Sequence, residues 1–197
     1  MTIASTQIRR DTWFVRNVQG LTAALGIVFG LFWIIDGVFK FKPGFVDAFS
    51  SSIAGAGPGQ PGWLQPWFSF WATTVSGNPA AFVYPVGILE LALGFALVTG
   101  FMKKVAYGGG VVLSLFIWAI PEGFGGPYGP GSTDIGTGIV YAIAFLMLML
   151  LNATFGPGRF SLDVVIERRW PSWTRIAELR SASTWRSKTG IRGPETA

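Results

Sequence analysis

The sequence predicts an all-α integral membrane protein: a four-transmembrane-helix bundle with an outer re-entrant or interfacial loop region and a cytoplasmic amphipathic C-terminal helix. Half of the 197 residues are hydrophobic and only 13% are charged, against about 25% in ordinary soluble domains. In addition, four long runs are nearly uncharged, at 21–41, 80–101, 105–120 and 135–155. A large soluble α-protein with buried helices would need more polar helix faces than so short a chain offers.

Each apolar run is long enough, or almost so, to cross a bilayer as a helix. A crossing takes roughly 20 apolar residues, with a usual range of about 17–25. The run 105–120 is short, but the ammonium group of Lys104 can extend to the headgroups and Pro121 can lie just beyond the hydrocarbon. These spans divide the chain into an N-terminal segment, a four-helix domain and a basic amphipathic tail, at 1–20, 21–155 and 156–197.

The basic residues predict the orientation of the bundle. Of the 15 lysines and arginines, all but Lys40 and Lys42 fall on one side of a four-span arrangement. Cytoplasmic loops carry such an excess, so both termini are expected in the cytoplasm and the segments 42–79 and 121–134 outside. The predicted location is the cell inner (cytoplasmic) membrane, as a multi-pass protein. A net charge of +5 then fits a cytoplasmic face beside anionic lipid, and nucleic acid is not expected as a partner.

Two segments outside the predicted spans have patterns of their own. In the segment 42–79, Trp63, Trp67 and Trp71 recur every four residues, which places three indoles on one face of a helix. Such a face suits an anchor at the lipid headgroups, or alternatively a surface on which a ligand stacks. In the tail, "SLDVVIERRWPSWTRIAELRSASTWR" mixes apolar residues with arginine, which is typical of a cationic helix lying on the inner leaflet.

The sequence contains neither cysteine nor histidine. Disulfides, iron–sulfur clusters held by this chain, the usual zinc sites and histidine-ligated haem are thereby excluded, and no metal site is expected. Histidine is also the commonest general base. Any redox chemistry must therefore pass through an organic molecule, such as a bound quinone, or through a cofactor held by a partner.

Few ionisable residues lie inside the spans. Asp36 and Lys40 are four residues apart near the outer end of the first span, on one helical face, with Trp33 one turn below. Glu90 lies in the second span, roughly 15 Å deep at about 1.5 Å per residue. A carboxylate there costs about 2.5–3.5 kcal/mol on insertion, so it is expected to face the bundle interior. Glu90 has either a proton-exchanging role or a structural hydrogen bond, and Asp36–Lys40 is either a structural ion pair or part of a site.

The stretch "PEGFGGPYGPGSTDIGTG", at 121–138, joins the third predicted span to the fourth on the outer face. Glycine permits a close approach of the backbone and proline stiffens it, which favours a fixed loop over the outer mouth rather than a plain connection. We expect this loop to form one wall of a pocket whose other wall is the first span with Trp33, Asp36 and Lys40. Either of two loop acids, Glu122 or Asp134, would then lie near Lys40.

Three stretches resemble the DoxX-like membrane protein family, in particular its DoxD branch: "GLFWIIDGVFKFKPGF", "GILELALGFALVTGF" and "PEGFGGPYGPGSTDIGTGIVYA". The resemblance covers about 21–155, whereas the tail is unassigned. DoxD is the membrane subunit of thiosulfate:quinone oxidoreductase. The resemblance therefore implies a four-helix membrane bundle that serves an oxidoreductase and delivers electrons to quinone.

Two classes of function follow. In the first, the chain is a quinone-facing subunit that passes electrons from a small oxyanion such as thiosulfate, attracted by Lys40 and Lys42, or from a partner, to quinone. Glu90 and Glu122 would be its catalytic, proton-exchanging residues. Charged or aromatic side chains would bind substrate or quinone: Trp33, Asp36, Lys40, Trp118, Tyr128 and Asp134.

In the second class, the chain is a structural or assembly subunit without catalysis of its own. It would pack the small-residue faces Gly26/Gly30 and Gly87/Gly94 against other membrane or peripheral subunits, or against further copies of itself. A transporter is a weaker third interpretation, because the chain is too short for the usual inverted repeats unless it oligomerises.

Overall fold

The computed structural model describes residues 13–128, 135–156, 158, 161–177 and 179, and their side chains from Asn17 onward. This part of the chain is helical and contains no strand. Its helices are α1 (Trp13–Phe39), α2 (Phe45–Gly55), α3 (Gln65–Ser76), α4 (Ala80–Thr99), α5 (Lys103–Ala119), α6 (Thr137–Phe155), α7 (Leu162–Arg169) and α8 (Thr174–Ala177). Short 3-10 turns lie at Gly62–Leu64 (η1), Gly123–Gly125 (η2) and Pro171–Trp173 (η3).

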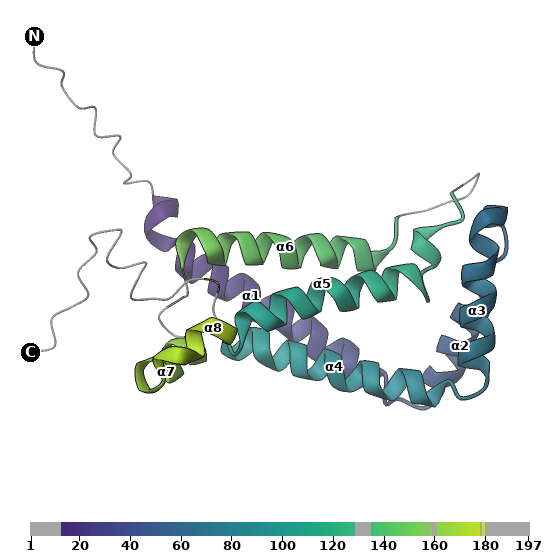
Figure 1. Ribbon diagram of the computed structural model, residues 1–197, viewed down its shortest axis with the longest axis horizontal. Coiled ribbons are helices and arrows are strands. Elements are labelled where there is room, and N and C mark those ends of the chain that lie inside the picture. The colour runs from purple at the N-terminus through teal and green to yellow at the C-terminus, as the bar shows by residue number, and fades with distance from the viewer. Residues whose placement is uncertain (1–12, 129–134, 157, 159–160, 178, 180–197) are drawn as a thin grey trace, which may run out of the picture.

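Three helices are long and apolar enough to cross a membrane: Asn17–Phe39 within α1, the whole of α4 and the whole of α6. In its described part, the structure therefore confirms an all-helical fold with the character of a membrane protein. These helices and α5 run along the long axis of the molecule, as Figure 1 shows. Helices α2 and α3 lie at one end of this bundle, and α7 and α8 lie at the other.

Glycines allow the backbones of α1 and α4 to touch. A β-carbon added to Gly30 would lie 2.8 Å from the carbonyl oxygen of Gly94, and one added to Gly94 would lie 2.6 Å from that of Gly30. Both distances are shorter than a van der Waals contact, so only glycine fits this crossing. The glycines of the two predicted small-residue faces line this interface inside the chain. The expectation that they pack against a larger complex is therefore wrong.

Substitution of Gly30 by alanine is expected to destabilise the protein by about 1–3 kcal/mol, because two backbones must separate to admit the methyl group. Gly20 is the matched control, since it lies in the same helix and a β-carbon there would meet nothing within 4 Å. Gly20→Ala should be neutral or stabilise the helix by about 0.5–1 kcal/mol. Denaturant titration in detergent micelles measures both, and equal effects at the two positions would contradict the close crossing.

The buried core lies between α1, α4, α5 and α6. It contains Trp33, Leu93, Tyr107 and Phe145, together with smaller neighbours. The Phe145 ring occupies the space beside Gly110, which a β-carbon on that glycine would fill. Trp33 packs against the rings of Tyr141 and Phe145, at centroid distances of 5.7 and 5.5 Å. Trp33 is thus fixed in the core of the bundle.

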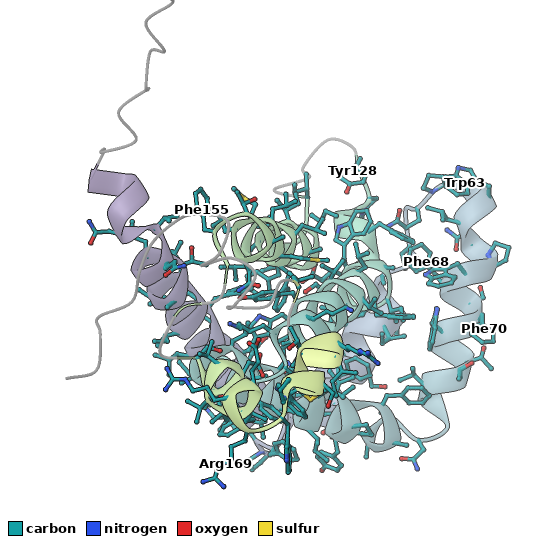
Figure 2. The ribbon with its side chains drawn as sticks, turned by 60° about the vertical axis from the view of Figure 1, so that its left-hand side comes forward. Trp63, Phe68, Phe70, Tyr128, Phe155 and Arg169 are labelled. Atoms are coloured by element: carbon teal, nitrogen blue, oxygen red, sulfur yellow. The ribbon has the colours of Figure 1, made fainter. Side chains whose placement is uncertain are left out.

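The three tryptophans of the outer segment do not share one helix. Trp67 and Trp71 lie in α3 with their rings in edge-to-face contact at 5.8 Å, but Trp63 lies in η1 and is 79% exposed. Pro66 stands in the first turn of α3, and because it has no amide hydrogen it cannot continue a helix from Trp63. In Figure 2, Phe68 points from α3 toward the bundle, whereas Phe70 points away from it.

The tail does not form one continuous helix. It is divided into α7, η3 and α8, because Pro171 cannot donate the hydrogen bond that would continue α7. The buried carboxylate of Asp163 accepts the amide hydrogens of Met102 (2.8 Å) and Lys103 (3.0 Å) at the start of α5. The indole of Trp173 donates to the same carboxylate at 3.0 Å. The described tail is therefore clamped to the turn between α4 and α5.

Candidate functional site

The structure joins Lys40 to Glu90. Lys40 follows the last residue of α1, and its Nζ lies 3.1 Å from Oε2 of Glu90 in α4. The Glu90 side chain is 0% exposed, so the expectation that it faces protein rather than lipid is confirmed. A carboxylate so deep in an apolar helix requires a partner, and the ammonium group of Lys40 provides it.

Asp36 completes a row of three charged groups. Its Oδ1 lies 3.7 Å from Lys40 Nζ, as the four-residue spacing predicted. Side-chain exposure falls along the row, from 47% at Asp36 through 13% at Lys40 to 0% at Glu90. The three groups therefore connect the surface of the bundle with its interior.

Gly87 makes room for this connection. It stands on the buried face of α4, about one turn before Glu90. A β-carbon on Gly87 would lie 2.9 Å from Cβ and 3.2 Å from Cγ of Lys40. The Lys40 side chain thus passes over a position that lacks a side chain, and in this way reaches Glu90. On its other side, Lys40 Nζ lies 4.9 Å from the centroid of the Phe45 ring.

Several buried polar atoms have no hydrogen-bond partner among the described residues, and Oε1 of Glu90, Nε1 of Trp33 and Oγ of Ser114 are among them. A buried polar group without a partner costs about 1–3 kcal/mol, and such a group in a native protein usually has a water or ligand to bind. Trp33 Nε1 is a donor, Glu90 Oε1 is an acceptor, and the Ser114 hydroxyl is both.

Glu122 does not pair with Lys40. Its Oε2 accepts the amide hydrogen of Gly138 at 2.8 Å, in the first turn of α6. The first amides of a helix lack partners within the helix and attract a carboxylate, which explains this position. Beside it, Trp118 Nε1 donates to the carbonyl oxygen of Ile135 at 2.8 Å. Of the two loop acids of which one was expected near Lys40, Glu122 is therefore engaged at the start of α6, and Asp134 lies outside the described residues.

The described part of the outer loop, 121–128, packs against α3 and α5. Phe124 adopts a left-handed backbone with φ of 59°, and its ring contacts those of Trp67, Phe68 and Trp118. Gln60 Nε2 donates to the carbonyl oxygen of Gly123 at 2.8 Å, and the hydroxyl of Tyr128 donates to that of Phe124. This part of the loop is held in place by these contacts with α3 and α5, and its role as a wall of a pocket shared with α1 stays a prediction.

The predicted site residues thus fall into two groups. Asp36, Lys40 and Glu90 form a connected charged site, and Trp33 lies about one turn from Asp36 on the same helix. Glu122, Trp118 and Tyr128 belong to the loop and the start of α6. Tyr128 is exposed.

Sequence reasoning grouped Gly87 with Gly94 as a small-residue face but did not predict that the Lys40 side chain lies over Gly87. For Gly87 a signal was present, because a glycine three residues before a buried glutamate lies on the same helical face and leaves a groove beside it.

Comparison of the chain with protein-family models, curated proteins and solved structures finds no match.

Proposed function

We propose that this chain is a DoxD-like, quinone-facing subunit of a membrane oxidoreductase, which passes electrons from a small oxyanion donor such as thiosulfate, or from a partner, to quinone. It acts as a four-span bundle in the inner membrane, with both termini in the cytoplasm. Helix α5 is the third span in chain order and completes the set of four: it has 17 residues, or about 25 Å at 1.5 Å per residue. The acid-free start of α5, with Lys103 and Lys104, fits the cytoplasmic end.

The observation that carries this proposal is the row Asp36–Lys40–Glu90. Reduction of a quinone to a quinol consumes two electrons and two protons, so a quinone site inside a membrane needs a route for protons. Chains of ionisable groups leading from the surface to the interior serve this purpose in membrane proteins. Here the half-exposed Asp36 contacts Lys40, which contacts the buried Glu90. In this proposal Glu90 donates protons to the substrate, and Asp36 takes up protons from the solvent.

The unpartnered atoms fit a quinone as substrate. A quinone oxygen accepts a hydrogen bond, which Trp33 Nε1 can donate, and a quinol hydroxyl donates one, which Glu90 Oε1 can accept. The two residues come from α1 and α4, which pack closely through Gly30 and Gly94. We therefore assign Trp33 to orientation of the substrate and Glu90 to proton exchange.

The oxyanion donor is proposed to bind away from the Asp36–Lys40–Glu90 row. The Lys40 ammonium lies against two carboxylates, so it is already neutralised and is a poor site for an anion. Lys42 is exposed, with Nζ 4.1 Å from the centroid of the Phe39 ring. In this proposal Lys42 is the outer cation that attracts thiosulfate or a partner's acidic surface. A role as assembly subunit is less well supported, because the glycine faces that favoured it lie against other residues of the same chain.

Mass spectrometry of gently purified protein tests the proposal. We expect bound quinone in the wild-type protein and about tenfold lower occupancy in Trp33→Phe, which lacks the indole donor. Trp71→Phe is the matched control, because Trp71 Nε1 is also buried without a partner but lies in α3. A constant partner chain without quinone in the wild-type preparation would favour the assembly role instead.

A further inference from the structure

The described tail presents a surface that the proposed quinone chemistry does not use. Its exposed charged side chains are all positive: Arg168, Arg169 and Arg175. Large apolar side chains are exposed among them, namely Val165, Trp170 and Ile176. We call these six residues the tail surface. Mixed arginine, tryptophan and aliphatic side chains are the composition that lies at the boundary between headgroups and acyl chains.

The tail surface is held at a fixed place by the buried side of the same segment. Asp163 binds the amides of Met102 and Lys103, and the Ser161 hydroxyl donates to the carbonyl oxygen of Gly100 at 2.7 Å. Further along, Lys104 Nζ donates to the carbonyl oxygen of Arg175 at 3.1 Å. These bonds fix α7 and α8 to the turn between α4 and α5, so their outward side chains are displayed rather than left to fold inward.

The turn between α4 and α5, to which the tail is bound, lies at one end of the helices that are proposed to cross the membrane. The last residue of α4, Thr99, and the first residue of α5, Lys103, flank the turn that carries the tail. In Figure 1, α7 and α8 lie at the end of the bundle where α1 begins and α6 finishes. Figure 2 shows Arg169 pointing away from the helices. A surface at the end of helices that cross a bilayer lies at the level of the headgroups.

We propose that the tail surface binds the headgroups of anionic phospholipids in the leaflet at this end of the bundle. The guanidinium groups of Arg168, Arg169 and Arg175 pair with lipid phosphates, which match their geometry and charge. Trp170 and Ile176 insert among the upper acyl chains. Of the two acids in the described tail, Asp163 is fully buried and engaged by α5 and Trp173, and Glu167 is half-buried, so neither is an exposed charge on this surface.

Titration of the detergent-purified, full-length protein with short-chain phosphatidylglycerol or phosphatidylcholine, followed by native mass spectrometry, tests this proposal. The wild-type protein should bind phosphatidylglycerol more tightly than phosphatidylcholine. The variant R168Q/R169Q/R175Q should lose about tenfold or more in affinity for phosphatidylglycerol, given the attraction of each basic residue to an anionic surface. The variant R168K/R169K/R175K keeps the positive charge and should retain most of the affinity for phosphatidylglycerol.

A matched control removes the same charge from the same tail. R186Q/K188Q/R192Q lies beyond the described residues and should change the affinity less than twofold. Equal losses in the two glutamine triples would overturn the proposal in favour of diffuse attraction, as would equal binding of the two lipids by the wild-type protein. If R168Q/R169Q/R175Q fails to fold, the wild-type protein still tests the proposal. Raised salt should weaken its binding of phosphatidylglycerol and leave its binding of phosphatidylcholine unaffected.

Discussion

Lys40→Met is expected to destabilise the folded protein by about 3–5 kcal/mol, which is the usual cost of leaving one member of a buried ion pair without the other. Methionine keeps the length of the side chain over Gly87 but removes the ammonium group 3.1 Å from Glu90. The Glu90 carboxylate is 0% exposed and has no second cation within ion-pair distance among the described residues. Denaturant titration in mild detergent measures the change in the free energy of unfolding.

Two further variants separate the ion pair from a general effect of substitution. The double variant Lys40→Met/Glu90→Gln should recover a large part of the loss, because no buried charge is then left alone. Lys42→Met should have little effect, since Lys42 is exposed. A double variant as unstable as Lys40→Met alone would show that the pair does not determine the stability of this site.

Glu90→Gln is expected to lower quinone reduction by the assembled complex about 100-fold or more, since loss of a positioned proton donor typically costs about 10²–10⁴ in rate. Glutamine has the shape of glutamate but carries no exchangeable acid proton. The readout is the rate of quinone reduction with saturating donor, and bound quinone is measured in the same preparation. Retained quinone with a lost rate indicates proton exchange, whereas loss of both indicates binding alone.

The control for this prediction is Asp47→Asn. Asp47 is an exposed acid in the first turn of α2, outside the charged row, so its neutralisation should leave the rate unchanged. An undiminished rate in Glu90→Gln would remove proton exchange from the proposed function of Glu90. The substrate assignment would then rest on Trp33 and the bound quinone only.

Hydropathy and local spacing made much of the fold predictable. Four apolar runs correspond to α1, α4, α5 and α6, because an uncharged run of this length has few alternatives to a helix that buries its backbone hydrogen bonds. The Asp36–Lys40 contact followed from helical periodicity, and the burial of Glu90 followed from the cost of exposing a carboxylate to hydrocarbon. Predictions of this kind need only the spacing of residues that are close in the sequence, or the free-energy cost of placing one residue in hydrocarbon.

Contacts between elements could not be predicted in the same way. The Lys40–Glu90 pair depends on which helix packs against α1, and periodicity carries no information about that order. Glu122 or Asp134 was expected near Lys40, because all three were placed at the outer end, but the Glu122 carboxylate accepts an amide hydrogen at the start of α6. The prolines that interrupt the tryptophan face and the tail were visible in the sequence, at Pro66 and Pro171, and their effect was underestimated.

The central claim is that Asp36, Lys40 and Glu90 supply the protons of quinone reduction, and the side of proton uptake tests it most directly. The active complex is inserted in one orientation into sealed vesicles with a pH-sensitive dye in each compartment. Protons should disappear from the compartment that faces Asp36 and the α2–α3 end, and Asp36→Asn should slow this uptake. Uptake from the compartment that faces α7 and α8, unchanged by Asp36→Asn, would contradict the claim.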